Sequence, residues 1–248
     1  MNILVYGIGG RMGRVVYSTV NNDNELNVVC GVDKFLETND FNVPVYKEIK
    51  DVKEKVDCII DFSNHVNVND YLPYAKEKNI PCVIASTGFN DDELRLINET
   101  SKYIPILKSG NMSLGINLLL QMSKLCAKVL GDKADIEIVE QHHNKKLDAP
   151  SGTALLLADG IKSVNPEYEY NIGRNGMSPR KKNEIGINAV RGGTIVGKHD
   201  VMFILDNEVI TLKHEAESRQ IFANGSISAA KFIVKQTPGL YSMENLFN

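Results

Sequence analysis

Apolar residues in the first half of the chain form short runs that alternate with helix-like stretches. Short apolar runs bounded by turn residues are typical of buried strands, whereas apolar residues three or four apart are typical of helices that face a core. Strand candidates lie at residues 3–6, 26–32, 56–63, 80–85 and 104–107. Their alternation with helical stretches, at 66–78 and 91–102 for example, predicts an α/β domain with a Rossmann-like parallel sheet and helices on both faces.

The regular alternation of strand-like and helix-like stretches ends after Ser113. Helix candidates lie at 114–130, with Gly131 as the residue that ends the helix, at 154–162 and at 218–235. The polar stretch 165–183 predicts a long loop. From residue 184 the apolar positions have a period of two. Together with an earlier apolar run, this period predicts strands at 136–139, 185–191, 194–197, 199–205 and 208–212. We therefore expect a second, α+β domain with an open mixed or antiparallel sheet.

A glycine-rich segment, residues 7–13, connects the first strand candidate to a helical stretch. Glycines in this context let the backbone approach a pyrophosphate, and the helix N-terminus favours its charge. Asp33 and Lys34 end the second strand candidate. The carboxylate suits the ribose hydroxyls of NADH, and the ammonium suits the 2′-phosphate of NADPH. The competing interpretations are a glycine turn that binds no nucleotide and a solvated charge pair.

Ligands of parallel α/β sheets bind outside the carboxyl ends of the strands. The turns that follow the strand candidates should therefore line one crevice. The cofactor-binding residues predicted in this way are Gly7, Ile8, Gly9, Gly10, Arg11, Met12, Asp33, Lys34, Ala85, Ser86, Thr87, Ser109, Gly110, Asn111 and Met112.

Residues 140–154 carry the densest group of reactive side chains: two adjacent histidines, two lysines, an aspartate and a Pro-Ser-Gly-Thr turn. Imidazoles exchange protons near neutral pH, and an ammonium can hold a carboxylate or donate a proton. A helix N-terminus at the turn would favour an anion. The competing interpretation is a polar loop before a helix capped by Ser151 or Thr153. Because the chain has only 5 histidines, a pair here favours a functional stretch.

Composition and charge restrict the class of protein. The net charge of −3 and a pI of about 6.0 argue against nucleic-acid binding. No apolar run is long enough to span a bilayer, and the chain starts directly with a strand candidate, so we expect a cytoplasmic protein without a signal peptide. The 4 cysteines form no C-x-x-C pair. We expect free thiols, with neither disulfides nor a metal site.

Residues 140–154, Glu-Gln-His-His-Asn-Lys-Lys-Leu-Asp-Ala-Pro-Ser-Gly-Thr-Ala, resemble the signature of the 4-hydroxy-tetrahydrodipicolinate reductase family, formerly called dihydrodipicolinate reductase. Further segments match the family in order and extend the resemblance over essentially the whole chain. These segments are residues 7–13, 86–89, 111–115, 190–193 and 218–223. The resemblance implies that NADH or NADPH reduces 4-hydroxy-tetrahydrodipicolinate to tetrahydrodipicolinate in the diaminopimelate route to lysine.

The resemblance also implies domains and residue roles. Residues 1–112 and 219–248 would form the dinucleotide-binding domain, and residues 113–218 the domain that binds substrate and builds a homotetramer. His142 would be a proton donor or acceptor, and Lys146 a second proton donor. His143, Gly152 and Thr153 would bind substrate. The chemistry agrees, because a dicarboxylate needs at least two anion sites, and a lysine with a helix N-terminus supplies them.

Two other classes of function stay open on the sequence. One is a different Rossmann-type oxidoreductase, acting on a semialdehyde or a sugar, which would not need residues 140–154 as they stand. The other is a regulator that binds NAD(P) without turnover. Cofactor oxidation that depends on the cyclic substrate separates all three.

Overall fold

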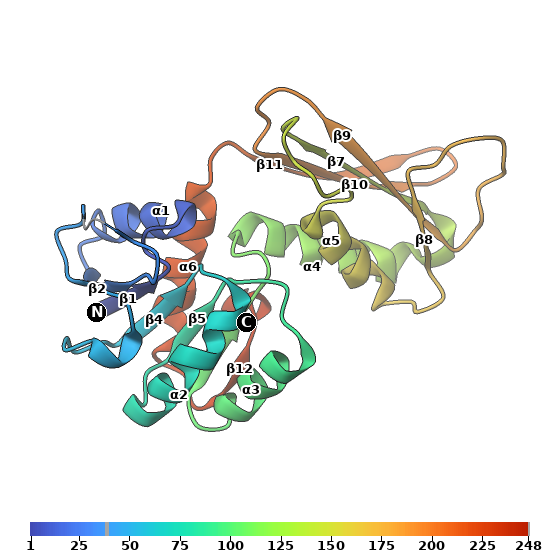
Figure 1. The fold of residues 1–248 in the computed structure, drawn as a ribbon. Coiled ribbons are helices and arrows are strands. Elements are labelled where there is room, and N and C mark those ends of the chain that lie inside the picture. The colour runs from blue at the N-terminus through green and yellow to red at the C-terminus, as the bar shows by residue number, and fades with distance from the viewer. Residues whose placement is uncertain (38–39, 248) are drawn as a thin grey trace. The chain divides into compact units, whose positions relative to one another are not determined.

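The structure is a computed structural model, and it describes residues 1–37 and 40–247. The chain divides into two compact units, one formed by Met1–Ser113 with Arg219–Asn248 and the other by Leu114–Ser218. The predicted fold class is confirmed: one unit contains a parallel Rossmann-like sheet and the other a mixed sheet (Figure 1). In the described part of the chain, no helix is long and apolar enough to cross a membrane.

The first unit is a seven-stranded parallel sheet in the order β12-β6-β5-β4-β1-β2-β3. Its strands are β1 (Asn2–Tyr6), β2 (Asn27–Val32), β3 (Val45–Tyr46), β4 (Cys58–Asp61), β5 (Cys82–Ile84), β6 (Pro105–Lys108) and β12 (Gly239–Tyr241). Its helices are α1 (Arg11–Val20), α2 (Val68–Lys78), α3 (Asp91–Ser101) and α6 (Gln220–Ile233), with short 3-10 turns η1 (Ile49–Asp51), η2 (His65–Asn67) and η4 (Met243–Phe247).

Alternate residues of each strand point to opposite faces of this sheet, and each face has its own core. Ile3 and Val5 of β1 pack with α1 and α6, whereas Leu4 and Tyr6 pack with α2 and α3. Because helices cover both faces, the strands are buried throughout and appear in the sequence as continuous apolar runs. The two strands missed by the sequence, β3 and β12, are edge strands of two and three residues, too short for a pattern.

The second unit is a five-stranded mixed sheet in the order β11-β10-β7-β9-β8. Its strands are β7 (Asp135–His142), β8 (Glu169–Ile172), β9 (Glu184–Arg191), β10 (Gly197–Ile204) and β11 (Val209–Ala216). Strand β10 is antiparallel to β7 and β11, while β7 is parallel to β9. Helices α4 (Leu114–Leu130) and α5 (Gly152–Lys162) pack on one face, and the short η3 (Gly131–Lys133) follows α4.

Two sequence predictions in this unit were wrong. A separate strand at 194–197 does not form, since β10 begins only at Gly197 and the preceding residues connect it to β9. The stretch 165–183 is not a continuous loop, because β8 pairs in parallel with β9 inside it. Strand β8 is a four-residue edge strand, Glu-Tyr-Asn-Ile, with polar and half-exposed residues, so it has no apolar period to recognise.

Helix α6 packs closely against the segment that follows β6, and we expect this contact to contribute to the stability of the fold. A Cβ at Gly225 would lie 1.7 Å from the carbonyl oxygen of Met112. We predict that Gly225→Ala lowers the free energy of unfolding by about 1–3 kcal/mol, because the backbone must move apart. The matched control is Asn224→Ala, at an exposed position one residue earlier on α6. This substitution should change the free energy of unfolding by less than about 0.5 kcal/mol. Urea unfolding measures both, and equal effects would contradict the close contact.

Candidate active site

The glycine-rich segment forms a tight turn between β1 and α1. Gly7 has φ +78°, and a Cβ there would lie 2.9 Å from Cβ of Ser63. A Cβ at Gly13 would lie 2.0 Å from the carbonyl oxygen of Gly7. Only glycine fits these two positions. Helix α1 starts with no side-chain cap at Gly10, so its N-terminal end keeps the backbone amides and the dipole that suit a phosphate.

Asp33 lies at the carboxyl end of β2 and holds the same turn. Its Oδ2 accepts the backbone N–H of Gly9 at 2.9 Å, and its Oδ1 accepts that of Phe35 at 3.0 Å. A cavity of about 190 Å³ opens beside it. Of the predicted residues, Gly7, Gly10, Asp33 and Lys34 line this cavity; other lining residues, which the sequence did not single out as binding residues, include Phe35, Asn64 and Asn67.

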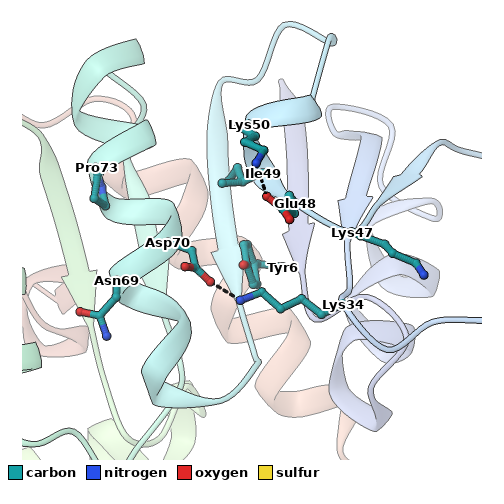
Figure 2. Close-up of a pocket in the computed structure, with 9 residues that line it drawn as sticks. All are labelled: Tyr6, Lys34, Lys47, Glu48, Ile49, Lys50, Asn69, Asp70 and Pro73. Carbon is teal, nitrogen blue, oxygen red and sulfur yellow. Dashed lines mark hydrogen bonds and ion pairs between the residues drawn. The ribbon is translucent and has the colours of Figure 1, made fainter.

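Lys34 has a partner that the sequence did not predict. Its ammonium pairs with Asp70 of α2, at the edge of a second cavity of about 600 Å³ (Figure 2). The two side chains are 41% and 43% exposed, so solvent screens the pair and its contribution is modest. An anion that approaches Lys34 therefore competes with Asp70 for the ammonium.

The other predicted cofactor residues follow β5 and β6 at the same edge of the sheet. Ser86 Oγ donates to Asp61 Oδ2 at 2.7 Å, and burial raises the pKa of Asp61. Ser109 Oγ donates to the carbonyl of Asn111 at 2.8 Å, which shapes the turn after β6. The side chains of Ile8 and Met112 belong to the core, so these two residues offer only their backbone to a ligand.

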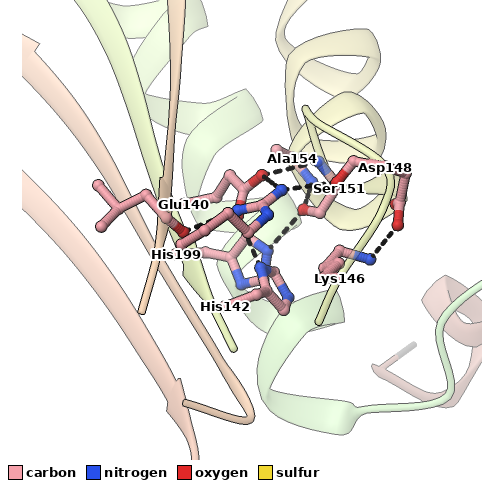
Figure 3. A network of polar contacts seen from close by, with 9 residues as sticks. Glu140, His142, Lys146, Asp148, Ser151, Ala154 and His199 are labelled. Carbon is pink, nitrogen blue, oxygen red and sulfur yellow. Dashed lines mark hydrogen bonds and ion pairs between the residues drawn. The ribbon is translucent and has the colours of Figure 1, made fainter. Parts of the chain in front are cut away.

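In the second unit, His142 is the last residue of β7 and is 9% exposed. Its Nδ1 lies 2.6 Å from Oε2 of Glu140, which is fully buried (Figure 3). Arg191 of β9 reaches both carboxylate oxygens of Glu140, at 2.7 and 2.8 Å. A carboxylate can only accept, so His142 carries its hydrogen on Nδ1 and exchanges protons through Nε2. A Cβ at Gly197 would lie 3.1 Å from Nε2, so a glycine there keeps this atom accessible.

Burial and charge set the protonation of this group. Burial lowers the pKa of His142, Glu140 acts to raise it, and Lys146 and Arg191 lower it again. Burial acts to raise the pKa of Glu140, but hydrogen bonds from Arg191, His142 and the Ser151 backbone hold it below its usual range. Burial also lowers the pKa of His199, whose ring centroid is 5.3 Å from that of His142, to about 3. Near pH 7 His142 is therefore neutral beside an ionised Glu140.

The loop after β7 carries the other predicted residues of this unit. Lys146 Nζ donates to Asp148 Oδ1 at 2.7 Å, which lowers the pKa of Asp148. His143 has a buried Nδ1 with no hydrogen-bond partner among the described residues. Ser151 caps α5 by accepting the N–H of Ala154 at 3.1 Å, so Gly152 and Thr153 form the first turn of the helix.

Sequence reasoning assigned no role to Glu140, Arg191 or His199. Glu140 did carry a signal, because a residue two positions before His142 on a strand lies on the same face. Arg191 lies in the segment 190–193 that matches the family, but nothing in the sequence linked it or His199 to this site, since both reach it through strand pairing with distant segments. Among the described residues no group of three His, Cys, Asp or Glu side chains is arranged to hold a metal ion.

Comparison with known proteins identifies the family. Residues 1–112 match the N-terminal and residues 115–247 the C-terminal family model of dihydrodipicolinate reductase. Proteins named 4-hydroxy-tetrahydrodipicolinate reductase from Caldanaerobacter subterraneus subsp. tengcongensis and Clostridium tetani are 52% and 45% identical, over 99% and 100% of this chain and 98% and 97% of theirs.

The fold agrees with this match. The structure of a dipicolinate-bound dihydrodipicolinate reductase from Paenisporosarcina sp. TG-14 superposes with a TM-score of 0.84, at 24% identity, over 99% of this chain and 98% of that one. With full-length relatives and both domain profiles in agreement, the chain belongs to the dihydrodipicolinate reductase family of oxidoreductases.

Proposed function

We propose that this chain uses NADH or NADPH to reduce 4-hydroxy-tetrahydrodipicolinate to tetrahydrodipicolinate, a step of diaminopimelate and lysine biosynthesis. One observation carries the proposal: the family signature folds into a buried, neutral His142 close to Lys146 and an N-capped helix start. The test is oxidation of NADH or NADPH that depends on the cyclic substrate, freshly made from pyruvate and aspartate semialdehyde. Turnover with a sugar or another semialdehyde instead, or cofactor binding without turnover, would contradict it.

Residues 1–112 and 219–248 would bind the cofactor. The turn of residues 7–12 would hold the pyrophosphate at the start of α1, and Asp33 and Lys34 would face the adenosine ribose. Residues 85–87 and 109–112 follow strands at the same edge and would extend the site. The bound dinucleotide supplies the hydride, and the protein binds, orients and exchanges protons.

Residues 113–218 would bind the substrate. Its two carboxylates need cationic or amide partners, which His143, Lys146 and the helix start at Gly152 and Thr153 offer. Loss of the 4-hydroxyl group as water leaves a conjugated imine, and hydride addition to this imine needs an acid for the ring nitrogen or an adjacent carbon. We assign the donation of that proton to Lys146, and the acceptance of a proton to His142, whose neutral ring has its lone pair at Nε2.

We also propose that the chain is a homotetramer built through the second unit. Helices α4 and α5 cover one face of its sheet (Figure 1). Among the described residues of this unit no helix packs on the opposite face, where Val190 and Val209 are 45% and 57% exposed. Burying such a face against another copy is favourable. Sedimentation should give a mass of about 110 kDa, four times the 27.5 kDa chain, and a monomer at micromolar concentration contradicts the proposal.

Lys146→Ala tests the proton donor. We predict a loss of turnover of roughly a hundredfold or more, because a positioned acid contributes about that much. The matched control is Lys145→Ala, since Lys145 is its exposed neighbour on the same loop and has no proposed role. Steady-state rates of both variants, with thermal unfolding to confirm the fold, decide the matter. Near-wild-type turnover in folded Lys146→Ala removes this residue from the reaction.

Thr153→Val tests the helix start. We predict weaker substrate binding with little change in cofactor binding, because only the hydroxyl is removed and a hydrogen bond to a charged group contributes about 1.5–3 kcal/mol. Thr153→Ser, which keeps the hydroxyl, should restore most of the affinity. Titration with dipicolinate, the molecule bound in the Paenisporosarcina reductase, and with NADH measures the two sites. Equal weakening of both ligands points to a disrupted helix instead.

Lys34→Ala and Asp70→Asn test cofactor choice in opposite directions. We predict wild-type affinities for NADH and NADPH within about tenfold of each other, since exposed charges contribute on the order of 1 kcal/mol. Lys34→Ala should weaken NADPH alone. Asp70→Asn should strengthen NADPH alone, because it releases the Lys34 ammonium from its pair. Titrations of each variant with NADH and NADPH at low and high salt measure these affinities. The change in NADPH affinity caused by each substitution should become smaller as the salt concentration rises. If Lys34→Ala shifts both cofactors equally, Lys34 does not recognise the phosphate.

A further inference from the structure

A buried carboxylate–guanidinium pair lies directly behind His142. Each oxygen of Glu140 accepts two hydrogen bonds: Oε1 from Arg191 Nη2 and the Ser151 N–H, and Oε2 from Arg191 Nη1 and His142 Nδ1. A carboxylate has about four acceptor positions, so this one is saturated. Glu140 therefore has no lone pair to offer a substrate, and its function must act through the groups that it holds.

Both terminal nitrogens of Arg191 are fully used, while its Nε is buried and has no hydrogen-bond partner among the described residues. Besides Glu140, Nη1 donates to the carbonyl of Val190 at 2.8 Å and Nη2 to the carbonyl of Asp148 at 2.6 Å. All four Nη hydrogens thus have acceptors within the second unit. The bond to Asp148 fixes the loop between His142 and Ser151, and the Ser151 N–H on Glu140 fixes its far end. An arginine bound in this way is not available as a carboxylate ligand for the substrate.

We propose that Glu140 and Arg191 are positioning residues for the reaction: Glu140 fixes the ring and tautomer of His142, and Arg191 keeps Glu140 from charging the imidazole while it anchors the loop that carries Lys146. The inference rests on the proposed function, in which His142 exchanges a proton. Glu140 alone would orient the ring and also favour the imidazolium. Arg191 neutralises that carboxylate, so the ring is oriented and stays neutral.

The groups that face His142 come from every element around it. Glu140 is on β7, Arg191 on β9, His199 on β10, and Lys146 on the loop. His199 is buried and neutral, and its Nε2 lies 3.1 Å from Ser151 Oγ. Ser151 Oγ accepts the N–H of Ala154, so its hydrogen is available for His199 and no charge enters from that side. The charges that act on His142 within this unit are therefore one anion, Glu140, and two cations, Arg191 and Lys146, of which Lys146 is itself paired with Asp148.

Removing Glu140 and removing Arg191 should shift the pKa of His142 in opposite directions. In Glu140→Gln the anion is lost and Lys146 and Arg191 remain, so the pKa of His142 should fall by about one unit or more. In Arg191→Met the carboxylate is unopposed, so the Glu140–His142 pair should take up its proton about one unit higher than in the wild type. A loss of packing alone would shift both variants in the same direction or not at all.

The tautomer gives a second readout. In Glu140→Gln the side-chain oxygen can stay on Arg191 Nη2 and the Ser151 N–H, which turns the amide NH₂ toward His142 Nδ1. The imidazole then has to accept at Nδ1 and carry its hydrogen on Nε2, so the reactive atom loses its lone pair. We expect turnover to fall by about a hundredfold or more, with KM changed by less than about threefold.

The experiment uses the full chain with ¹⁵N- and ¹³C-labelled histidine. With 5 histidines, His142→Gln assigns the His142 signals. Titration then gives its pKa and tautomer in the wild type, Glu140→Gln and Arg191→Met, and the pH dependence of kcat is measured on the same samples. Arg180→Met is the matched control, because Arg180 holds Glu137 and Glu184 at the opposite ends of β7 and β9. It should leave the His142 titration unchanged.

Arg191→Lys covers the case in which Arg191→Met does not fold. It keeps the charge but cannot bind both carboxylate oxygens and the Asp148 carbonyl, so kcat should fall while the pKa of His142 moves by less than about half a unit. Opposite pKa shifts, or a reversed tautomer in Glu140→Gln, support the proposal. Unchanged pKa and tautomer in all folded variants, or a raised KM with normal kcat in the Arg191 variants, overturn it. A wild type without reductase activity defeats the proposed function, whereas an active wild type whose folded variants keep the pKa and tautomer of His142 defeats this inference alone.

Discussion

The parallel pairing of β7 with β9 is the constraint on which the histidine site depends. Its register sets His142 opposite Arg191, the last residue of each strand. The period of two places Glu140 on the same face as His142, so the guanidinium reaches the carboxylate behind the ring. A shift of the register by one residue would turn Arg191 to the other face and leave Glu140 buried without a cation. The register of one strand pair therefore sets the ionisation of the site.

The first unit places its binding residues by a similar rule. All of its strands are parallel, so their carboxyl ends meet at one edge, where the turn of residues 7–12, Asp33 and residues 85–87 lie. Close packing then determines the shape of the turn. Gly13 has to let the Gly7 carbonyl approach, and Gly9 has to donate to Asp33 without a Cβ in the way. Both units thus concentrate polar function where parallel strands end and the apolar core no longer dictates the residue type.

These rules explain how much the sequence could predict. The main strands, the helices and the glycine turn each leave a local signal, in period or in residue type, and were recognised. Strands β3, β8 and β12 leave none, because two to four residues at a sheet edge show no period. The partners Asp70 for Lys34 and Arg191 for Glu140 lie 36 and 51 residues away. Such pairs depend on register and helix placement, which a single sequence does not encode in any one window.

Buried ion pairs are a weak source of stability, because the loss of solvation offsets much of their attraction. The second unit nevertheless has one at each end of the β7–β9 pair. At the amino ends Arg180 binds Glu137 and Glu184 and donates to the carbonyls of Ile136 and Glu184.

At the carboxyl ends Arg191 binds Glu140 and donates to the carbonyls of Val190 and Asp148. In both places an arginine supplies donors to carbonyl groups, and its charge compensates carboxylates that the sheet has buried. The two ends differ in what the carboxylate holds besides the arginine. Of these carboxylates, only Glu140 also holds an imidazole, because β7 continues two residues beyond it to His142. An arginine–carboxylate pair thus holds the two strands together at their amino ends. At their carboxyl ends, where His142 is added, the same kind of pair sets the protonation of a reactive side chain.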